Sequence, residues 1–245
     1  MSSLKLSNPH SVLAALEVRP KDVLEIHASR QTSNDGWKRV LHAAREQGIP
    51  VREPLQRDAG KDHRRAREGG RVGTTFAVVR EKQGLSLEEL FTTDVPRGLW
   101  IALDQLQDPH NVGAVFRTAA FFGVQGIVLT VDRSAPLSAT VYDVASGGME
   151  YVPFTLQTNL AQGIEIAKKQ NLWVLGSSEH AAEEVDQIDR DRRWLLVMGN
   201  EEKGLRKLTQ QRCDQVCRIA AQGAVGSLNV SVATGILIAS LSRPQ

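Results

Sequence analysis

One stretch near the C-terminus decides how the rest of the chain is interpreted: Gly223-Ala224-Val225-Gly226-Ser227-Leu228-Asn229-Val230-Ser231-Val232-Ala233-Thr234-Gly235. Small and polar residues lead into a run that is apolar at helical spacing, with one face made of Val230, Ala233, Leu237 and Leu241 and another made of Val232, Ile236 and Ala239. A helix that is apolar on nearly all sides is buried or is shared with a partner chain. The pattern therefore predicts a C-terminal helix with two apolar faces.

The first turn of this expected helix is polar, because it carries Ser227, Asn229 and Ser231. Ser and Asn are common at helix starts, where their side chains accept hydrogen bonds from unpaired backbone N–H groups. In that interpretation Ser227 and Asn229 are helix caps. The same position also suits a phosphate group, since the N-terminus of a helix attracts anions. The stretch alone leaves both interpretations open.

Charge is unevenly distributed along the 245 residues. Residues 1–82 hold 16 Lys and Arg against 10 Asp and Glu, a net charge of +6, whereas the remainder holds 14 against 18, a net charge of −4. A basic first part joined to an acidic second part indicates contact with a polyanion, with chance sampling as the alternative. The apolar fraction of 41% supports a proper hydrophobic core.

The sequence favours a cytoplasmic protein without a membrane segment. Its two cysteines, Cys213 and Cys217, are too few for a disulfide scaffold, and we interpret them as buried thiols in a reducing compartment. The N-terminus lacks the apolar core of a signal peptide, and no run reaches the roughly 18 apolar residues of a membrane span. We expect no metal site, because none of the six histidines is clustered for one.

Hydrophobic periodicity predicts a small α/β module in residues 1–82, a linker in 83–95 and a larger α/β domain in 96–245. In the module we expect helices at 9–17 and 36–47 and strands at 23–29, near Val51 and at 74–80. In the larger domain we expect strands at 99–103, 126–131, 171–176, 194–198 and 215–220, and helices at 112–122, 138–146, 159–170, 205–212 and 229–241. Such alternation is typical of a parallel sheet covered on both faces.

The module contains one strongly basic segment, from Arg57 to Arg71. It has six Lys or Arg residues, three glycines and no large apolar residue, so it is predicted to be a loop. Most such loops are merely solvated. Because this one lies in the basic part of the chain, Arg64, Arg65 and Arg67 are equally candidates for RNA contact.

The first strand of the larger domain leads into a polar loop that ends at Asn111, followed by Gly113 and Arg117. In open α/β sheets, ligands bind beyond the carboxyl ends of the strands, so this loop is well placed. Asn111 is a natural cap for the helix that follows. Gly113 stands one turn before Arg117 and leaves room above the arginine for a large group. Without a ligand, Arg117 is an ordinary surface arginine.

A second polar loop follows the strand at 194–198, with Glu201 between Gly199 and Gly204. The glycines allow a ligand to approach the backbone closely. Glu201 is either a solvated acid or a positioned carboxylate. The chain has no G-x-G-x-x-G after a strand, no P-loop, no H-E-x-x-H and no G-x-S-x-G, so dinucleotide, nucleotide-hydrolysing, zinc-protease and serine-hydrolase sites are not supported.

The three polar regions form a set of motifs: N-x-G-x-x-x-R-T-A from Asn111 to Ala119, V-M-G-x-E-x-x-G from Val197 to Gly204, and S-L-N-V-S-V-A-T-G from Ser227 to Gly235. In order and separation they resemble the motifs of the SpoU branch of the SPOUT RNA 2′-O-methyltransferases. The later run Asp132-Arg133-Ser134-Ala135, with Val152-Pro153 after it, resembles members that methylate a guanosine ribose in 23S rRNA. The resemblance is strong over residues 97–242 and weaker before them, where Pro9-His10-Ser11 replaces an expected glycine-containing start.

The resemblance implies a fold that periodicity does not indicate. Residues 96–245 would form a trefoil-knotted α/β domain with a parallel sheet, and residues 1–82 would form a small RNA-binding domain like ribosomal protein L30e. S-adenosylmethionine would lie in the knotted loops, held largely by backbone groups. The cofactor-binding positions that match the family are Met198, Gly199, Ile219 and Leu228.

The resemblance also implies roles for the polar residues. Arg117 would be the catalytic base that deprotonates a ribose hydroxyl, or would instead stabilise the alkoxide or clamp a phosphate. Asn111, Ser227 and Asn229 would orient ribose and phosphate, and Glu201 would position Arg117 or the loops. The family forms homodimers in which a second chain completes each site. The alternatives left open are a tRNA ribose methyltransferase of the same branch and a non-catalytic RNA-binding protein on this fold.

Overall fold

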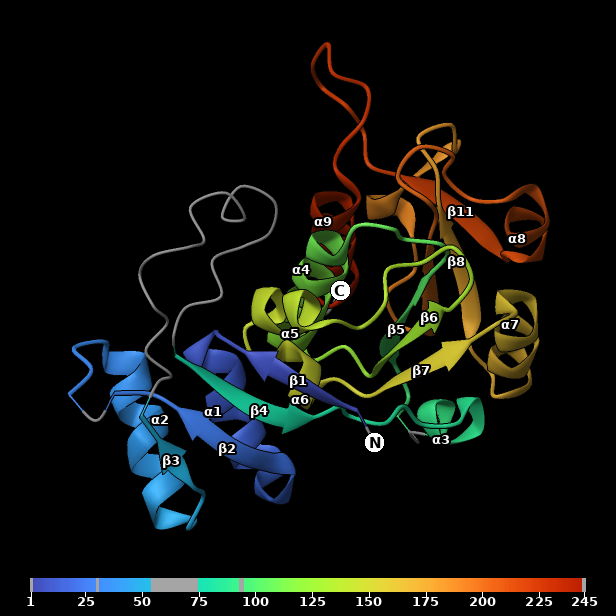
Figure 1. The fold of residues 1–245 in the computed structure, drawn as a ribbon. Helices are drawn as coiled ribbons and strands as arrows, with labels where there is room; N and C mark the ends of the chain where they lie inside the picture. The colour runs from blue at the N-terminus through green and yellow to red at the C-terminus, as the bar shows by residue number, and fades with distance from the viewer. Residues whose placement is uncertain (1, 30, 54–74, 93–94, 244–245) are drawn as a thin grey trace.

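The computed structural model describes residues 2–29, 31–53, 75–92 and 95–243. Two sheets organise this part of the chain, one of four strands in the N-terminal module and one of seven strands in the larger domain (Figure 1). Their boundary falls where the charge pattern changes sign. Among the described residues, no helix has both the length and the apolar composition needed to span a lipid bilayer.

The module is built around a mixed sheet in the order β1-β4-β2-β3. Strand β4 is antiparallel to β1 and β2, while β2 and β3 are parallel. Its two long helices begin at asparagine caps, because the side chains of Asn8 and Asn34 accept backbone N–H groups of the first turn. The elements are β1 (Ser3–Leu6), α1 (Pro9–Val18), η1 (Pro20–Asp22), β2 (Val23–His27), α2 (Asp35–Glu46), β3 (Val51–Arg52) and β4 (Phe76–Arg80).

The segment between module and domain, expected to be a linker, holds one short helix, α3 (Leu87–Phe91). A capping box fixes its start, since Ser86 and Glu89 exchange side-chain and backbone hydrogen bonds. Leu90 and Phe91 are buried against the large sheet, and the Trp100 indole donates to the Leu90 carbonyl at 2.9 Å. The described part of this segment is therefore packed onto the domain.

The large sheet is parallel throughout, as the alternating pattern predicted. Its strands lie in the order β7-β6-β5-β10-β8-β11-β9. Periodicity did not indicate the short elements β7, β9, α6 and η2. The elements after α3 are β5 (Gly98–Leu103), α4 (Pro109–Phe122), β6 (Gly126–Thr130), α5 (Ala139–Ala145), α6 (Gly148–Tyr151), β7 (Phe154–Gln157), α7 (Leu160–Lys169), β8 (Trp173–Ser177), β9 (Glu183–Glu184), η2 (Val185–Gln187), β10 (Arg193–Met198), α8 (Lys207–Arg212), β11 (Gln215–Arg218) and α9 (Val230–Leu241).

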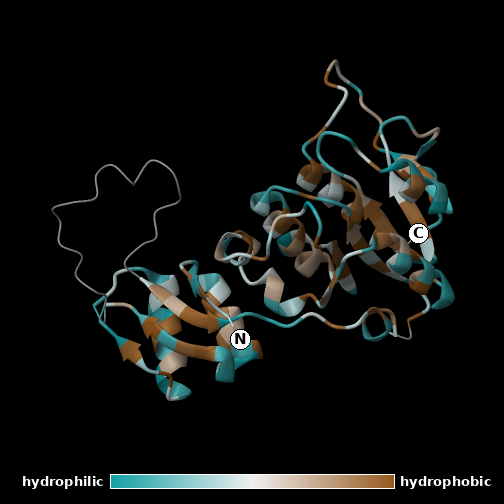
Figure 2. Ribbon diagram, turned by 45° about the vertical axis from the view of Figure 1, so that its right-hand side comes forward, coloured by the Kyte–Doolittle hydropathy of each residue, from teal (hydrophilic) through white to brown (hydrophobic). Residues whose placement is uncertain are grey.

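Strand β5 shows that both faces of this sheet are covered. Leu99, Ile101 and Leu103 belong to the apolar cluster that includes α4 and α9, whereas Trp100 and Ala102 belong to the cluster under α3 and α7. Alternate side chains thus enter opposite layers, as a pleated strand requires. In Figure 2 the strands of this sheet are largely apolar and lie between the helices.

Only one of the two expected apolar faces of α9 is buried within the chain. Leu237, Ile238 and Leu241 pack in the core, whereas Val232 is 50% exposed and Ile236 is 37% exposed. The second face therefore lies at the surface, beside α4.

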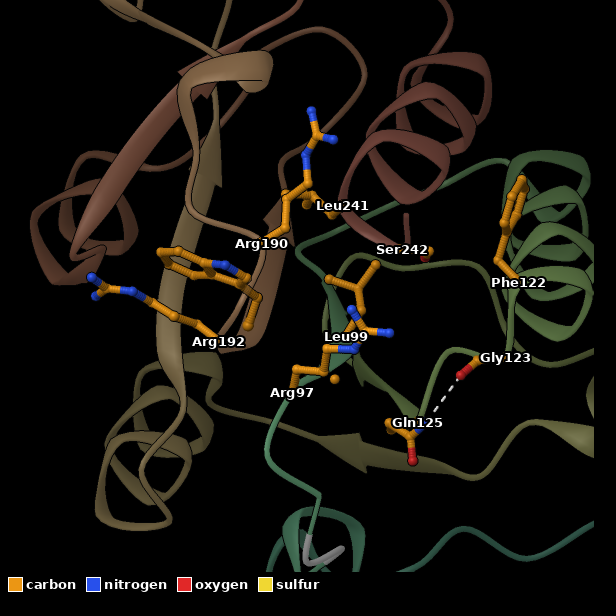
Figure 3. Close-up of a pocket in the computed structure, with 11 residues that line it drawn as sticks. Arg97, Leu99, Phe122, Gly123, Gln125, Arg190, Arg192, Leu241 and Ser242 are labelled. Carbon is orange, nitrogen blue, oxygen red and sulfur yellow. Dashed lines mark hydrogen bonds between the residues drawn. The ribbon is translucent and has the colours of Figure 1, made fainter. Parts of the chain in front are cut away.

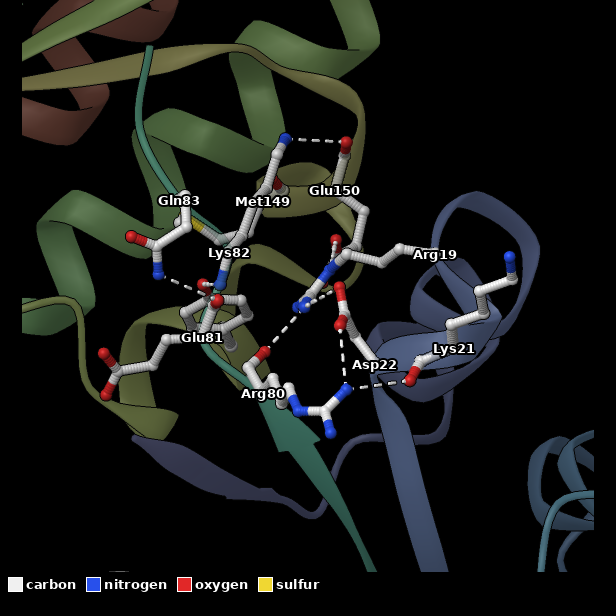
Figure 4. A network of polar contacts seen from close by, with 10 residues as sticks. Arg19, Lys21, Asp22, Arg80, Glu81, Lys82, Gln83, Met149 and Glu150 are labelled. Carbon is white, nitrogen blue, oxygen red and sulfur yellow. Dashed lines mark hydrogen bonds and ion pairs between the residues drawn. The ribbon is translucent and has the colours of Figure 1, made fainter. Parts of the chain in front are cut away.

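Buried charged groups join the module to the domain (Figure 4). The Glu150 carboxylate, 1% exposed, accepts from Arg19 Nε at 2.6 Å and from a terminal guanidinium nitrogen at 2.9 Å. Lys82 Nζ donates to the carbonyls of Met149, Glu150 and Val152 around the end of α6, at 2.8, 2.8 and 3.1 Å. Burial lowers the pKa of Lys82. The helix α1 and strand β1 consequently rest directly on α5 and α6.

Candidate active site

Asn111 connects all three polar regions of the sequence beyond the carboxyl ends of the strands. Its Nδ2 donates to Glu201 Oε1 at 3.3 Å, and its Oδ1 accepts from Asn229 Nδ2 at 3.0 Å. The side chain is 7% exposed, so these are the partners that replace water. Residues that are 90 and 118 positions from Asn111 in the sequence meet at this one amide.

Glu201 is exposed and its carboxylate is held by long hydrogen bonds, so it has features of both alternatives that the sequence left open. Besides Asn111, it accepts the backbone N–H groups of Gln107 at 3.3 Å and Asp108 at 3.4 Å. These N–H groups precede α4, where the helix dipole favours a negative charge. The carboxylate therefore fixes the loop between β5 and α4.

The helix cap differs from the expectation. Asp108, not Asn111, is the N-cap of α4, and its side chain accepts the His110 N–H at 2.8 Å. Pro109 explains the shift, since proline favours the first helical position. Asn111 is thereby free to make the contacts that cross the site. Asn229, in contrast, is both the cap of α9 and a partner of Asn111.

The loop around Glu201 is a tight turn closed by its own backbone. Asn200 and Gly204 exchange N–H···O hydrogen bonds of 3.1 and 2.9 Å. A Cβ on Gly199 would lie 2.2 Å from the Gly204 carbonyl carbon, and Gly204 has a φ of +62°. The turn itself leaves no room for a side chain at Gly199 and favours glycine at Gly204, and close approach of a ligand to this backbone stays a prediction.

A second buried anchor, which sequence reasoning missed, lies behind this turn. The Asp104 carboxylate, 1% exposed, accepts from Arg206 Nε and from a terminal nitrogen of the same guanidinium at 2.8 Å each, and Thr209 Oγ1 donates to it at 3.2 Å. The pair fastens the chain after Gly204 to the end of β5. The partners are 102 residues apart, so no local spacing in the sequence indicates them.

Asn111, Glu201 and Asn229 form what we name the Asn111 cluster. Two other candidates, Arg117 and Ser227, form no hydrogen bond with this cluster within the chain. Arg117 is exposed on α4 and makes no hydrogen bond or ion pair with any described residue. Ser227 is also exposed, in the loop before α9. The expected space above Gly113 is filled, because a Cβ there would lie 2.7 Å from Val144 Cβ of α5. That glycine allows close helix packing and does not make room for a ligand.

The expected cofactor positions lie around the same edge of the sheet. Met198 is buried at the end of β10, Ile219 packs partly against the core, and Leu228 is 51% exposed. Figure 1 shows the chain between β11 and α9 projecting from the layers. No backbone group of residues 220–228 forms a hydrogen bond with any described residue. These N–H and C=O groups are free to bind the polar atoms of a ligand. The neighbouring apolar side chains of Ile219 and Leu228 suit contact with a ring of the same ligand.

One cavity, of about 110 Å³, lies at the opposite edge of the sheet, and Figure 3 shows the residues that line it. It is lined by Arg97 and Gly98 at the start of β5, by Gly123 after α4 and by Ser242 after α9. Its position separates it from the Asn111 cluster. The expected RNA contacts Arg64, Arg65 and Arg67 lie outside the described residues.

A wholly parallel, doubly covered sheet with polar loops joined beyond its strand ends defines an α/β protein whose ligand site is at that edge. A family model described as the SpoU rRNA Methylase family matches residues 98–239. The chain belongs to this family. The resemblance of its three motifs is thereby confirmed.

Curated relatives extend the similarity to the full chain. The chain is 36% identical over 252 residues to a 23S rRNA (guanosine-2'-O-)-methyltransferase of Pseudomonas putida, covering 100% of this chain and 98% of the relative. The protein of the same name from Escherichia coli K12 is 34% identical, with 96% of each chain covered.

Solved structures show the same fold. The methyltransferase AviRb from Streptomyces viridochromogenes, in complex with AdoMet, has a TM-score of 0.76 at 18% identity and covers 98% of this chain and 89% of its own. An AdoMet-bound rRNA methyltransferase from Sinorhizobium meliloti has a TM-score of 0.75 at 21% identity and covers 98% of this chain and 86% of its own.

Proposed function

We propose that this chain is an S-adenosylmethionine-dependent methyltransferase that modifies the ribose 2′-oxygen of a guanosine in 23S ribosomal RNA. The observation that carries the proposal is the single amide of Asn111 bonded to both Glu201 and Asn229. Three motifs of the family thereby meet in one place. The full-length similarity to 23S rRNA (guanosine-2'-O-)-methyltransferases supports the rRNA guanosine as substrate.

S-adenosylmethionine supplies an electrophilic methyl group when it is bound. We propose that Met198, Gly199, Ile219 and Leu228 hold it. The apolar side chains of Ile219 and Leu228 would contact it, as would the backbone of residues 220–228, which forms no hydrogen bond with the part of the chain that the structure describes. The binding of AdoMet by two proteins of the same fold supports this choice of cofactor. The trefoil knot and the L30e-like fold of the module remain predictions from the resemblance.

The remaining chemistry is to make a ribose hydroxyl nucleophilic and to hold it in line with the methyl group. Arg117 is proposed to act on that oxygen, as base or by stabilising the alkoxide. A guanidinium is a very weak acid and keeps its proton at neutral pH, which favours the second role. Asn111, Ser227 and Asn229 orient ribose and phosphate. Glu201 holds Asn111 and the loop before α4 in place.

Transfer of labelled methyl from S-adenosylmethionine to total rRNA and tRNA, followed by mapping of the alkali-resistant positions, tests the function. We expect label at a 23S rRNA guanosine. Arg117→Ala should abolish transfer and leave cofactor binding nearly intact, while Arg212→Ala, which removes a half-buried arginine of α8 that pairs with Glu165, should change neither. Full activity of Arg117→Ala would refute its role.

The same experiment separates the competing functions. Label on tRNA alone would identify a tRNA ribose methyltransferase, and RNA binding without transfer would identify a non-catalytic protein. Neutralising Arg64, Arg65 and Arg67 should weaken RNA binding and flatten its salt dependence. The cytoplasm is the proposed compartment, in keeping with the two free thiols Cys213 and Cys217.

We further propose that the active form is a homodimer formed through α4 and α9. These helices pack together, and their outer side presents Phe121, 83% exposed, with Val232 and Ile236. A second chain on this side would approach Arg117, which lies one helical turn before Phe121. Phe121→Asp should give monomers in sedimentation and should lose methyl transfer. Wild-type activity from a sedimenting monomer would contradict the dimer.

A further inference from the structure

Among the described residues, helices α1 and α2 cover one face of the module's sheet and leave the other face open. Four side chains point to the covered face and pack with residues of α1 and α2. They are 0–1% exposed: Leu6, Ile26, Ala77 and Val79. The neighbouring positions on each strand point to the other face. We name this side the open face; it consists of Lys5, Glu25, His27, Arg52, Phe76 and Val78.

An aromatic stack stands in the middle of the open face. His27 pairs with Phe76 on one side and with Arg52 on the other, so the three side chains form one cross-strand row. The rings of His27 and Phe76 are stacked, with centroids 4.6 Å apart and planes at 12°. Lys5 Nζ lies 5.0 Å from the Phe76 ring centroid. The ring is thus bordered by a histidine and by an exposed, flexible cation.

The polar groups around the stack leave the open face with an excess of positive charge. Glu25 is the acid of the face, and it is engaged by Arg52 Nε at 2.9 Å and by His27 Nε2 at 2.9 Å. His27 Nδ1 is buried and has no hydrogen-bond partner among the described residues. Lys5 forms no close ion pair among them, although its charge, after those of His27 and Arg52, helps to lower the pKa of Glu25. An aromatic ring beside an ammonium group that holds no close carboxylate suits a planar ring that carries a phosphate.

We infer that the open face binds unpaired nucleotides of the RNA substrate, with a base stacked on Phe76 and Lys5 moved from the ring onto the neighbouring phosphate. Sheets that carry exposed aromatic and basic side chains recognise single-stranded RNA in this way, whereas the bases of a duplex hide their faces from such a ring. The net charge of +6 of residues 1–82 favours a polyanion such as RNA. The inference rests on the proposal that the chain acts on RNA.

Binding of labelled RNA to the full-length protein tests this site. The probes are a 12-nucleotide unstructured pyrimidine-rich strand and a hairpin duplex of equal length. Phe76→Leu keeps apolar bulk and removes the ring, so it should weaken binding of the single strand about tenfold without altering the salt dependence. Phe76→Tyr keeps an aromatic ring and should bind the single strand with wild-type affinity. Duplex binding should be unaffected by either change.

Lysine variants supply the matched control. Lys5→Gln should reduce the slope of log affinity against log salt by about 0.7, the value for one phosphate contact on a single strand. Lys38→Gln, which removes the same charge from α2 on the covered side, should leave the slope unchanged. Wild-type affinity of Phe76→Leu in a folded protein would overturn the inference and make the stack purely structural.

The outcome is separable from that of the proposed function. Loss of single-strand binding in Phe76→Leu, in a protein that transfers no methyl group to any RNA, would sustain the open face and refute the methyltransferase. Unchanged binding together with normal methyl transfer would do the reverse.

Discussion

At the scale of single residues, Asn111 is the position whose chemical type the site restricts most. One side chain must donate to Glu201 and accept from Asn229, and an amide has both functions whereas a carboxylate has no donor. Asn111→Ala should lower the free energy of unfolding by about 1–2 kcal/mol, because it leaves partly buried partners unsatisfied. It should also reduce methyl transfer well beyond that loss. Thermal denaturation and transfer kinetics measure the two effects.

Two further variants test the geometry. Asn111→Asp would face the Glu201 carboxylate with a second negative charge and should be as damaging as alanine. His110→Ala, at an exposed position in the same turn, should be silent. Equal activity of Asn111→Asp and the wild type would show that the donor is not needed.

The sequence identified Asn111, Glu201 and Asn229 as candidates but not what they contact. Their motifs are visible locally, whereas the bond from Asn111 to Asn229 spans 118 positions. For the same reason Asp104 escaped notice, because its partner Arg206 lies after a different strand. A residue's type and spacing predict where it sits on an element, and the packing of elements decides what it touches.

At the scale of elements, the turn after β10 offers a contrast between two glycines. Gly199→Ala should open the turn and cost roughly 1–3 kcal/mol, because the new methyl group would overlap the peptide between Gly204 and Leu205. Gly204→Ala meets no atom within 4 Å and carries only the cost of a positive φ, about 1 kcal/mol. Chemical denaturation of both variants, with cofactor binding measured in parallel, checks the order. A milder effect at Gly199 would contradict this account of the turn.

Periodicity predicted the long strands and helices of the larger domain and the parallel direction of the strands. It did not indicate β1 or β7, each only four residues long. Strands of that length hold too few alternations to be told from a loop, and they are defined by their partners: β1 pairs with β4, and β7 pairs with β6. Similarly, α9 has two apolar faces in the sequence, and only the fold distinguishes the buried face from the exposed one.

At the scale of the whole molecule, the junction makes the module and the domain a single mechanical unit. The buried Glu150 carboxylate and the Lys82 ammonium both cross it. If RNA binds the open face as proposed, this junction sets its distance from the Asn111 cluster, so that a remote contact can help to select one nucleotide. The apolar core is also continuous across the junction, since Leu16 and Met149 belong to the same cluster.

This coupling predicts how the protein unfolds. Glu150→Leu removes the buried carboxylate from Arg19, which keeps only the Asp22 carboxylate at 3.4 Å and the Arg80 carbonyl at 2.6 Å, and should cost about 3 kcal/mol. Glu150→Leu with Arg19→Met should cost less than the single change, because no buried guanidinium is left without its main carboxylate. Calorimetry should show one transition in the wild type and two in Glu150→Leu, where the module melts first. Lys38→Ala, which breaks the exposed ion pair with Asp35, should melt in a single transition at the wild-type temperature. If Glu150→Leu melted in a single transition at the wild-type temperature, apolar contacts alone would hold the two parts together. The charged contacts would then not set the distance between the proposed RNA contact and the methyl acceptor.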